Sequence, residues 1–279
     1  MNVFNTVKDL KNHISSLKKD ASIGFVPTMG ALHEGHLSLI KKAKAENDYV
    51  AVSIFVNPTQ FDNTEDLIKY PQTLEKDLEL LKSVACDLVF APNASEIYKN
   101  NIQATSFDFG GIENEMEGKF RKGHFDGVGT IVKKLFEIVN PTKAYFGEKD
   151  FQQLQIIKKL IEIEKMPIEI IGCPIFREND GLAMSSRNTR LTKEQREAAP
   201  FIYKILKKAK KKFGTKNADE VTKWVTKKFK KHPILDLEYF IIADENSLKK
   251  SNKKENNKPQ RAFIAVYAGD IRLIDNLAL

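Results

Sequence analysis

Short apolar runs alternate with segments of helical periodicity along residues 1–176. The apolar runs predict strands, and the most distinct of them are Ile23–Pro27, Tyr49–Val56, Asp87–Phe90 and Ala144–Phe146. The segments between them place apolar residues three and four positions apart, as on one face of a helix. Helices are predicted at Ala31–Ala45 and Thr73–Val84, and a further apolar run, Ile168–Ile175, closes the sheet. This alternation is typical of βαβ units and predicts an α/β domain with a Rossmann-like, mostly parallel sheet.

The first twenty residues predict an amphipathic helix. Val3, Val7, Leu10, Ile14 and Leu17 recur at spacings of three and four, without the continuous apolar stretch of a signal peptide. No later segment approaches the roughly 18 uninterrupted apolar residues that a membrane span requires. We therefore expect a soluble, cytoplasmic protein with no membrane partner.

The pattern changes after Phe176. Arg177–Arg190 is polar and contains glycine, and it predicts a loop. Beyond it the sequence predicts two helices, two strands and an exposed polar connection between the strands, at Lys193–Phe213, Ala218–Lys231, Leu237–Ala243, Arg261–Tyr267 and Ser247–Gln260. We expect a first domain over residues 1–176 and a second, smaller α/β or α+β lid domain over residues 177–279.

Length and cysteine content restrict the class of protein. The chain has 279 residues, enough for one large or two modest domains with proper cores. Its two cysteines, Cys86 and Cys173, lie in apolar runs and have neither the CxxC spacing nor the framework of a disulfide-rich protein. They fit a reduced cytosolic protein in which both are core residues.

The net charge of +8 is concentrated in the C-terminal third of the chain. Residues 177–279 contain 24 lysines and arginines against 13 aspartates and glutamates, whereas residues 1–176 contain 21 against 24. Many of these lysines lie in Lys207–Lys212 and Lys227–Lys231, on predicted helices with an apolar face, and they indicate a solvated face or a surface that steers anions. No aromatic-interleaved signature of an RNA-binding module accompanies these lysines, so we expect no nucleic-acid partner.

The segment Gly24–His36, GFVPTMGALHEGH, joins a predicted strand to a predicted helix through a glycine-containing turn. Backbone N–H groups and the positive end of the helix dipole make such a helix start an anion-binding site. His33 and His36 are expected to face the same side, where two imidazoles suit a triphosphate. Two histidines at this spacing equally suit half of a metal site or helix capping, although the zincin spacing is lacking. H-x-G-H after a strand resembles the phosphate-binding signature of nucleotidyltransferases and class I aminoacyl-tRNA synthetases.

Four further motifs follow this segment along the chain. They are Phe55–Phe61 (FVNPTQF), Tyr70–Pro71, Phe146–Gln153 (FGEKDFQQ) and Asp180–Asn188 (DGLAMSSRN). Together with Gly24–His36 they resemble, in the same order and over about residues 24–190, the motif set of pantothenate synthetases. The resemblance implies an enzyme that condenses pantoate with β-alanine, using ATP and Mg²⁺ and releasing AMP and pyrophosphate through a pantoyl adenylate.

Two of these motifs follow predicted strands, at the edge of a parallel sheet where ligands bind. Gln60 lies in an Asn-Pro turn and offers an amide donor and acceptor, with stabilisation of the turn as the alternative role. Lys149 lies in the tetrapeptide after Phe146, where a surface ion pair with Glu148 or Asp150 is the alternative.

The resemblance also implies roles for particular residues. His36, His33 and Lys149 are implied to be catalytic, with His36 as a proton carrier. The residues implied to contact ATP are Met29, Gly30, Ala31, Leu32, His33, Glu34, Gly35, His36, Gly147, Glu148, Lys149, Asp150, Phe176, Met184, Ser185, Ser186 and Arg187. Those implied to hold pantoate or close its pocket are Asn57, Gln60, Phe61, His124 and Gln153. A loop before a core helix explains His124 equally well.

Met184–Arg187 provides two hydroxyls and a guanidinium within four residues, which suits a departing pyrophosphate. Asp180–Gly181 before it favours a turn, so a loop closing over ATP is expected, with a polar interdomain linker as the alternative. Mg²⁺ should accompany ATP, with Asp77 as the candidate ligand, although Lys76 stands where some family members carry an acid. Water and phosphate would then supply most of the ligands, and an ordinary helix-face charge is the alternative for Asp77. The resemblance further implies a homodimer.

A carboxylate is not attacked by an amine at neutral pH until it is activated, so the implied reaction begins with adenylation. The sequence shows no Ser-His-Asp or Cys-His arrangement, and positioning with charge stabilisation suffices for this chemistry. One alternative is another H-x-G-H nucleotidyltransferase, such as pantetheine-phosphate or nicotinate adenylyltransferase. Those enzymes are generally smaller and lack the Asn57–Gln60 and Gly147–Asp150 motifs. The other alternative, from a different class, is an RNA-binding module.

Overall fold

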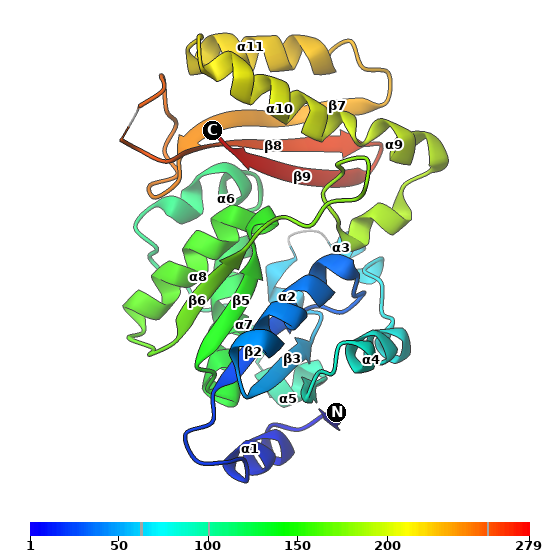
Figure 1. Cartoon of the computed structure of the whole chain (residues 1–279), viewed down its shortest axis with the longest axis vertical. Helices are drawn as coiled ribbons and strands as arrows, with labels where there is room; N and C mark the ends of the chain where they lie inside the picture. Colours follow the sequence, from blue (N-terminus) through cyan, green and yellow to red (C-terminus); the bar gives the residue numbers. More distant parts are fainter. Residues whose placement is uncertain (62–63, 100, 256) are drawn as a thin grey trace. The chain divides into compact units, whose positions relative to one another are not determined.

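A six-stranded parallel sheet forms the centre of the N-terminal part of the chain (Figure 1). The computed structural model describes residues 1–61, 64–99, 101–255 and 257–279. Neighbouring strands are parallel, in the order β1, β4, β3, β2, β5, β6. In chain order they are β1 (Asn2–Phe4), β2 (Ile23–Thr28), β3 (Tyr49–Ile54), β4 (Leu88–Phe90), β5 (Lys143–Gly147) and β6 (Glu169–Cys173). The predicted Rossmann-like α/β architecture is confirmed.

Alternate residues of the central strands face two separate apolar layers. In β2, Phe25 packs in one layer and its neighbour Val26 in the other, and in β5 Ala144 and Tyr145 are separated in the same way. The first layer is completed by α1 (Val7–Ser15), α7 (His124–Val139) and α8 (Phe151–Ile163), and the second by α2 (Glu34–Glu46) and α4 (Leu74–Ser83). Helices therefore cover both faces, as a buried parallel sheet requires.

The strand order reverses between β2 and β5. From β2 the chain proceeds outward through β3 to β4, and it later crosses to β5 on the other side of β2. In open α/β sheets, ligands bind outside the carboxyl ends of the strands at such a reversal. Thr28 ends β2 and Gly147 ends β5, so the two motifs that follow these strands begin at the favoured ligand position.

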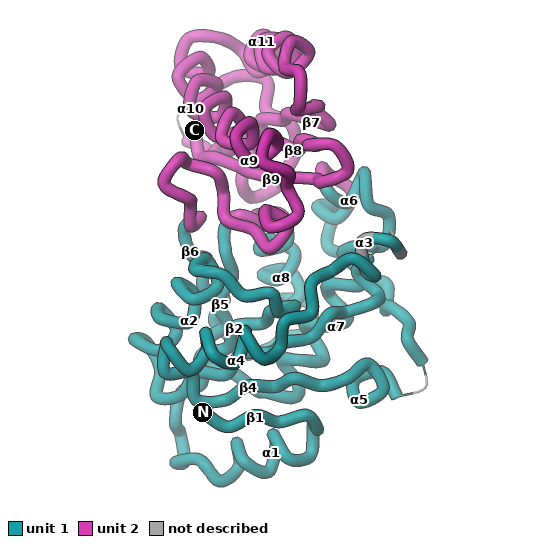
Figure 2. Tube along the Cα trace, turned by 90° about the vertical axis from the view of Figure 1, so that its right-hand side faces the viewer, with its two compact units in different colours: residues 1–113, 117–148, 153–174 teal, residues 114–116, 149–152, 175–279 magenta. Residues whose placement is uncertain are grey.

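The chain forms two compact units, coloured separately in Figure 2. Unit 1 comprises residues 1–113, 117–148 and 153–174, and unit 2 comprises residues 114–116, 149–152 and 175–279. Shorter helical elements connect the strands of the first part. They are η1 (Pro58–Gln60), α3 (Thr64–Ile68), α5 (Ala94–Tyr98), η2 (Ile112–Asn114), α6 (Met116–Phe120) and η3 (Glu148–Asp150).

Unit 2 contains a three-stranded antiparallel sheet in the order β7, β8, β9. Its strands are β7 (Leu235–Asp244), β8 (Gln260–Ala268) and β9 (Ile271–Ala278), and its helical elements are η4 (Ser186–Arg190), α9 (Lys193–Ala198), α10 (Phe201–Phe213) and α11 (Ala218–Phe229). Ile205 of α10 and Val225 of α11 pack with alternate residues of β8, such as Ile264 and Val266. This α+β arrangement matches the smaller C-terminal part of the predicted fold class.

The prediction of one helix over the first twenty residues was wrong. Residues Asn2–Phe4 form β1, and Val3 pairs with Val89 of β4 instead of continuing the apolar face of α1. Thr6 caps α1, because its side chain accepts a hydrogen bond from the Asp9 backbone amide. A strand of three residues is too short to show an alternating pattern, so only its pairing with β4 distinguishes it from a helix.

Two predictions in the C-terminal part were incomplete. The predicted helix Lys193–Phe213 is divided into α9 and α10, and the break falls at Ala199 and Pro200. Proline has no amide hydrogen to donate, so it suits the start of α10 and ends the helix before it. Strand β9 was not predicted, because Arg272, Asp275 and Asn276 interrupt its apolar pattern.

Both cysteine side chains are buried and free, as expected of a reduced protein. Burial raises the pKa of the Cys86 thiol to about 12 and that of Cys173 to about 11, so neither provides a thiolate near neutral pH. Within the described parts of the chain, no helix has both the length and the apolar character needed to span a bilayer.

Candidate active site

The turn after β2 has a left-handed backbone at two successive residues. Gly30 has φ +79° and Ala31 has φ +49°. A Cβ on residue 30 would lie 3.0 Å from Oδ2 of Asp77, so glycine is required there for both conformation and space. The left-handed pair delays the helix, which begins at Glu34 and not near Ala31 as predicted. The segment between Thr28 and Glu34 is therefore a shaped loop, in which the Gly30 amide donates to Thr28 Oγ1 at 3.2 Å.

Asp77 fixes the shape of this loop. Its Oδ2 accepts a hydrogen bond from the Ala31 amide at 2.9 Å, and its Oδ1 accepts one from the Leu32 amide at 2.8 Å. The Thr73 hydroxyl also donates to Oδ1, at 3.2 Å. Asp77 is only 1% exposed, on the first turn of α4. The carboxylate thus compensates buried amide donors, and the alternative of an ordinary exposed helix-face charge does not hold.

These contacts bear on the predicted metal role of Asp77. Both of its carboxylate oxygens already accept hydrogen bonds, and the side chain is buried. Among the described residues there is no group of three His, Cys, Asp or Glu side chains that could hold a metal ion. The residues present therefore do not fit a metal held by the protein alone.

We expect Asp77→Ala to destabilise the protein by about 2–4 kcal/mol, since it removes the charged acceptor of one buried and one partly buried backbone amide. The shift would be measured by urea unfolding. Glu79→Ala, on the exposed side of the same helix, is the matched control and should change the free energy of unfolding by less than about 0.5 kcal/mol. Equal effects of the two substitutions would contradict the anchoring role.

His33 and His36 lie side by side at the start of α2. Their ring centroids are 4.0 Å apart, with 34° between the ring planes. His33 is the N-cap residue of α2, and its Nδ1 accepts a hydrogen bond from the Gly35 amide at 3.1 Å. The ring proton of His33 therefore lies on Nε2. The prediction that both imidazoles share one side is confirmed, with His33 in the cap and His36 in the first turn.

Gln60 connects this turn to the end of the next strand. Its Nε2 lies 2.9 Å from Sδ of Met29, the first residue after β2. Asn57 donates from Nδ2 to Gln60 Oε1 at 3.1 Å and to the Gly127 carbonyl at 3.2 Å. The structure therefore brings together the predicted ATP-binding residue Met29 and the predicted pantoate-binding residues Asn57 and Gln60.

The orientation of Asn57 is set by Tyr98, which lies outside the motifs of the sequence. The Tyr98 hydroxyl donates to Asn57 Oδ1 at 2.5 Å. Burial raises the pKa of Tyr98 above its ordinary value, so the hydroxyl keeps its proton and remains a donor. No local signal marked Tyr98, because it lies 41 residues from Asn57 along the chain.

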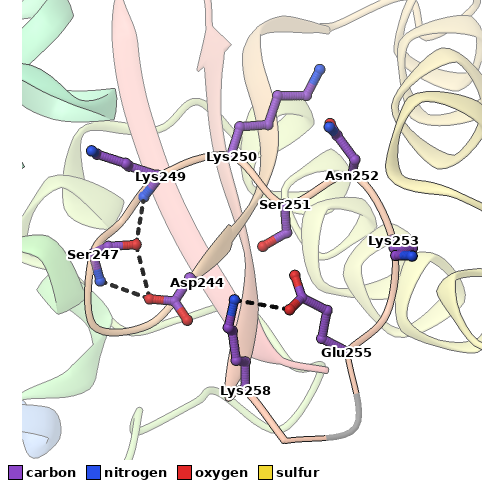
Figure 3. A pocket seen from close by; sticks show the side chains of 9 residues that line it. All are labelled: Asp244, Ser247, Lys249, Lys250, Ser251, Asn252, Lys253, Glu255 and Lys258. Atoms are coloured by element: carbon purple, nitrogen blue, oxygen red, sulfur yellow. Dashed lines mark hydrogen bonds and ion pairs between the residues drawn. The ribbon is translucent and has the colours of Figure 1, made fainter.

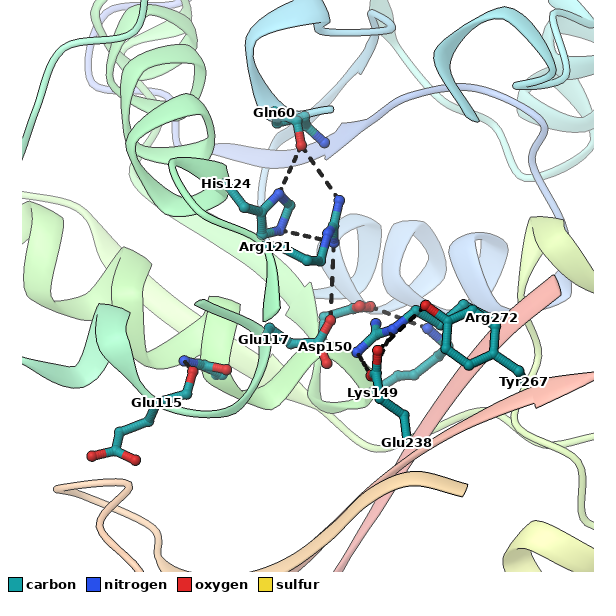
Figure 4. Close-up of polar contacts among 11 residues, drawn as sticks. Gln60, Glu115, Glu117, Arg121, His124, Lys149, Asp150, Glu238, Tyr267 and Arg272 are labelled. Atoms are coloured by element: carbon teal, nitrogen blue, oxygen red, sulfur yellow. Dashed lines mark hydrogen bonds and ion pairs between the residues drawn. The ribbon is translucent and has the colours of Figure 1, made fainter. Parts of the chain in front are cut away.

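His124 and Arg121 support the backbone of Gln60, as Figure 4 shows. His124 Nδ1 lies 2.8 Å from the Gln60 carbonyl oxygen, and Arg121 Nη1 lies 3.2 Å from His124 Nε2. The neutral tautomer with its proton on Nδ1 satisfies both contacts, because the guanidinium can only donate. Glu117 Oε2 lies 3.9 Å from Arg121 Nη1. His124 thus holds the backbone of Gln60. This contact agrees with the alternative that His124 serves the structure at the start of a core helix.

The other predicted pantoate-binding residues also lie in unit 1. Phe61 ends η1 and packs edge-on against Tyr70 of the Tyr-Pro motif, with ring centroids 5.7 Å apart. A Cβ on Gly127 would clash with the Thr59 carbonyl, so this glycine allows α7 to approach η1 closely. Gln153 is half-buried near the start of α8. Phe61 and Gln153 keep their predicted roles as predictions.

The tetrapeptide after β5 is divided between the units. Gly147 and Glu148 belong to unit 1, and Lys149 and Asp150 to unit 2. Lys149 Nζ lies 3.6 Å from Asp150 Oδ2, so the predicted surface ion pair is present, although the Lys149 side chain is only 19% exposed. The Lys149 carbonyl accepts a hydrogen bond from Asn276 Nδ2 at 2.9 Å. Asn276 lies outside the motifs of the sequence.

The predicted ATP loop begins with a tight turn in unit 2. The Met184 amide donates to the Phe176 carbonyl at 3.0 Å, the Glu178 amide donates to the Leu182 carbonyl at 2.9 Å, and Gly181 has φ +96°. Ser185 then caps η4, with its Oγ accepting from the Arg187 amide at 3.3 Å. The turn predicted from Asp180–Gly181 is confirmed, whereas closure over ATP stays a prediction.

The remaining polar contacts of Figure 4 and the cavity of Figure 3 lie in unit 2. Glu238 accepts hydrogen bonds from Arg272 and from the Tyr267 hydroxyl. The cavity, of about 550 Å³, is lined by Asp244, Ser247, Lys249, Lys250, Ser251, Asn252, Lys253, Glu255 and Lys258. Lys250 and Lys258 are engaged in ion pairs, with Asp219 at 2.7 Å and Glu255 at 2.9 Å. None of the predicted site residues lines this cavity, and we assign it no part in the site.

Comparison with known proteins identifies close relatives of the whole chain. The family model described as pantoate-beta-alanine ligase matches residues 2–278. The chain is 58% identical to the pantothenate synthetase of Christiangramia forsetii, over 100% of this chain and 99% of that protein. It is 56% identical to the pantothenate synthetase of Flavobacterium psychrophilum, over 100% of both proteins.

Solved structures of similar proteins have the same fold. Pantothenate synthetase from Thermus thermophilus superposes with a TM-score of 0.91 at 38% identity, covering 99% of each chain. Pantoate-beta-alanine ligase from Francisella tularensis, complexed with beta-gamma ATP and beta-alanine, superposes with a TM-score of 0.81 at 41% identity. That comparison covers 99% of this chain and 97% of the Francisella chain.

Proposed function

Because this chain belongs to the pantoate-beta-alanine ligase family, we propose that it condenses pantoate with β-alanine to form pantothenate, with ATP converted to AMP and pyrophosphate. The structural observation that carries the proposal is the loop after β2. A buried carboxylate, Asp77, shapes that loop so that two imidazoles lie together at the start of α2. The amide of Gln60 contacts the same loop at Met29.

The reaction requires two displacements. A carboxylate oxygen of pantoate attacks the α-phosphorus of ATP, the bond from that phosphorus to the bridging oxygen breaks, and pyrophosphate leaves. The amine of β-alanine then attacks the acyl carbon of the pantoyl adenylate, releases a proton and displaces AMP. No enzyme nucleophile is needed, so the side chains act by positioning the reactants and by stabilising the developing charge.

The loop and helix start supply donors for the phosphates. His33 presents its Nε2–H, because its Nδ1 is occupied by the Gly35 amide. His36 and the first turn of α2 add an imidazole and the positive end of a helix dipole. We assign phosphate contact to both histidines and transfer of the amine proton to His36. The rest of the loop, Met29–Leu32 with Glu34 and Gly35, supplies the ATP-binding backbone.

The remaining roles follow the order of the motifs. We assign the hydroxyl and carboxylate groups of pantoate to Gln60 and Gln153, and we place Phe61 among the apolar neighbours of its methyl groups. Lys149 is assigned to the ATP phosphates and Asp150 to the ribose, beside Gly147 and Glu148. Phe176 and Met184–Arg187 complete the nucleotide site, with Ser185, Ser186 and Arg187 nearest to the departing pyrophosphate.

Mg²⁺ belongs to the proposal as the companion of ATP. The hydrogen bonds of Asp77 favour a metal held by phosphate oxygens and water. When bound, the metal neutralises phosphate charge. We further propose that residues 1–176 bind ATP and pantoate, that residues 177–279 act as a lid, and that the protein is a cytoplasmic homodimer. No nucleic-acid or membrane partner is included.

Product analysis tests the function directly. The protein is incubated with ATP, Mg²⁺, pantoate and β-alanine, and we expect equimolar AMP, pyrophosphate and pantothenate. With β-alanine omitted, labelled pyrophosphate should exchange into ATP only when pantoate is present, which reports the adenylate. Formation of ADP, or exchange that does not depend on pantoate, would refute this function. Adenylyl transfer to pantetheine phosphate or nicotinate mononucleotide would favour the related transferases.

A further inference from the structure

Asn276 holds the backbone of Lys149 from a distant part of the chain. It lies in β9, is 2% exposed and donates from Nδ2 to the Lys149 carbonyl at 2.9 Å. Its Oδ1 accepts a hydrogen bond from Arg261 Nη1 at 2.6 Å. Both ends of the amide are therefore used, and the orientation of the side chain is fixed. Asn276 and Lys149 are 127 residues apart in sequence and both belong to unit 2.

The residues after Lys149 are anchored to the same sheet. Phe151 packs against Phe263 of β8, with ring centroids 5.9 Å apart. The Arg261 guanidinium lies over the Phe151 ring, with Cζ 4.0 Å from the centroid, and its Nε donates to Glu245 at 2.9 Å. Arg261 thus contacts both Asn276 and Phe151, the two residues that hold the Lys149 segment.

The residue beside Asn276 holds the predicted ATP loop. Asp275 forms a two-pronged ion pair with Arg177, at 2.7 and 2.9 Å, and also accepts from the Asn276 amide at 2.7 Å. Arg177 donates in addition to the Gly181 carbonyl at 3.1 Å and to the Asn276 carbonyl at 3.3 Å. Its guanidinium stacks on Tyr203 at 3.7 Å. Arg177 therefore ties the turn before Met184–Arg187 to the end of β9.

The network around Asp275 and Asn276 contributes little to the stability of the sheet for the desolvation it requires. A buried ion pair loses hydration energy that its own attraction barely recovers, and apolar residues of similar size often stabilise as well or better. What a buried pair with all its hydrogen bonds does supply is a single fixed geometry. Here that geometry connects β9 to two segments that the proposed function places on phosphate groups.

We propose that Asn276 is a positioning residue that places Lys149 for adenylate formation. The inference rests on the proposed function, because it takes Lys149 to contact the phosphates. The adjacent residue Asp275 binds Arg177, which holds the turn before Met184–Arg187, so two successive residues of β9 hold Lys149 and this loop. In this role the Asn276 side chain acts on catalysis through Lys149 and not by contact with substrate.

The test is pantoate-dependent exchange of pyrophosphate into ATP by Asn276→Ala. We expect the maximal exchange rate to fall by about 10- to 100-fold, since a misplacement of about 1 Å has effects of this size, while the KM for pantoate changes by less than about twofold. In a Lys149→Ala background, Asn276→Ala should lower the rate by less than about threefold further. The effects of substituting two residues that act through one group do not add.

The outcomes separate the inference from the function. A wild-type enzyme that makes no pantothenate would refute the function. With the function intact, an unchanged rate in Asn276→Ala, or the same loss in both backgrounds, would overturn the positioning role. Asn252→Ala, an exposed asparagine of the same unit, is the matched control and should leave the rate unchanged.

A second variant guards against loss of folding. Asn276→Asp keeps an oxygen for Arg261 and replaces the amide donor to Lys149 with a carboxylate oxygen, so it should show the same loss of rate and the same lack of additivity. Folding of each variant is checked by its thermal transition. If neither variant folds, Asn276 acts on stability and the proposal fails.

Discussion

Replacing Lys149 with alanine is expected to lower the rate of adenylate formation by about two to three orders of magnitude, the usual cost of removing one preorganised charge-stabilising group. Negative charge grows on the phosphate oxygens as the pantoate carboxylate attacks. The Lys149 ammonium is prepared for this task, because its backbone is held by Asn276 and its side chain is 19% exposed. Because the cation is already in place, it stabilises the charge of the transition state more than it stabilises the bound substrates.

The effect of Lys149→Ala is measured as the single-turnover rate of adenylate formation with saturating ATP and pantoate. The matched control is Lys158→Ala, an exposed lysine on α8, which should keep the wild-type rate. The second step, with chemically prepared pantoyl adenylate and β-alanine, should be affected much less, because the pyrophosphate has already left. A Lys149→Ala rate within about threefold of wild type would exclude the assigned role.

Replacing His36 with alanine is expected to have a loss of the same size, about 10²- to 10³-fold in adenylate formation. His36 lies in the first turn of α2, and its ring lies 4.0 Å from that of His33. Removal of the His36 ring therefore takes away one phosphate donor. It also removes the ring that packs against His33 and helps to orient it. The rate would be followed by pantoate-dependent pyrophosphate exchange.

The variant His36→Gln separates the two roles assigned to His36. Glutamine places an amide donor near the position of Nε2 but has no group that titrates near neutral pH. We expect His36→Gln to recover most of the adenylation lost in His36→Ala, and to remain impaired in the transfer to β-alanine, where a proton is released. His13→Ala on α1 serves as the control for removing an imidazole. Full activity of His36→Ala in both steps would disprove both roles.

The sequence was informative wherever function depends on residues close together in the chain. The apolar runs Ile23–Pro27 and Tyr49–Val56 predicted two strands of the sheet, which the structure places at Ile23–Thr28 and Tyr49–Ile54. The spacing of His33 and His36 predicted their proximity, because three residues at the start of a helix bring side chains to one side. The predictions were wrong where an element depends on pairing with a distant strand, as β1 depends on β4.

The polar residues that organise the site were invisible or misread at the sequence level. Asp77 was a possible metal ligand or surface charge, and the structure makes it the acceptor for the amides of Ala31 and Leu32. Asp275 and Asn276 obscured the apolar pattern of β9, and this interruption was itself the signal that two polar residues are buried there. A buried polar side chain needs a partner, and sequence pattern does not say which one.

The sequence by itself determined the class of fold, the order of the motifs and the family, because periodicity and short motifs are properties of neighbouring residues. Only the tertiary structure decided what Asp77, Tyr98 and Asn276 do. Their partners lie 41 to 127 residues away, and the hydrogen bonds exist only after the strands and helices have packed. Burial makes those bonds obligatory, whereas the fold chooses which groups meet.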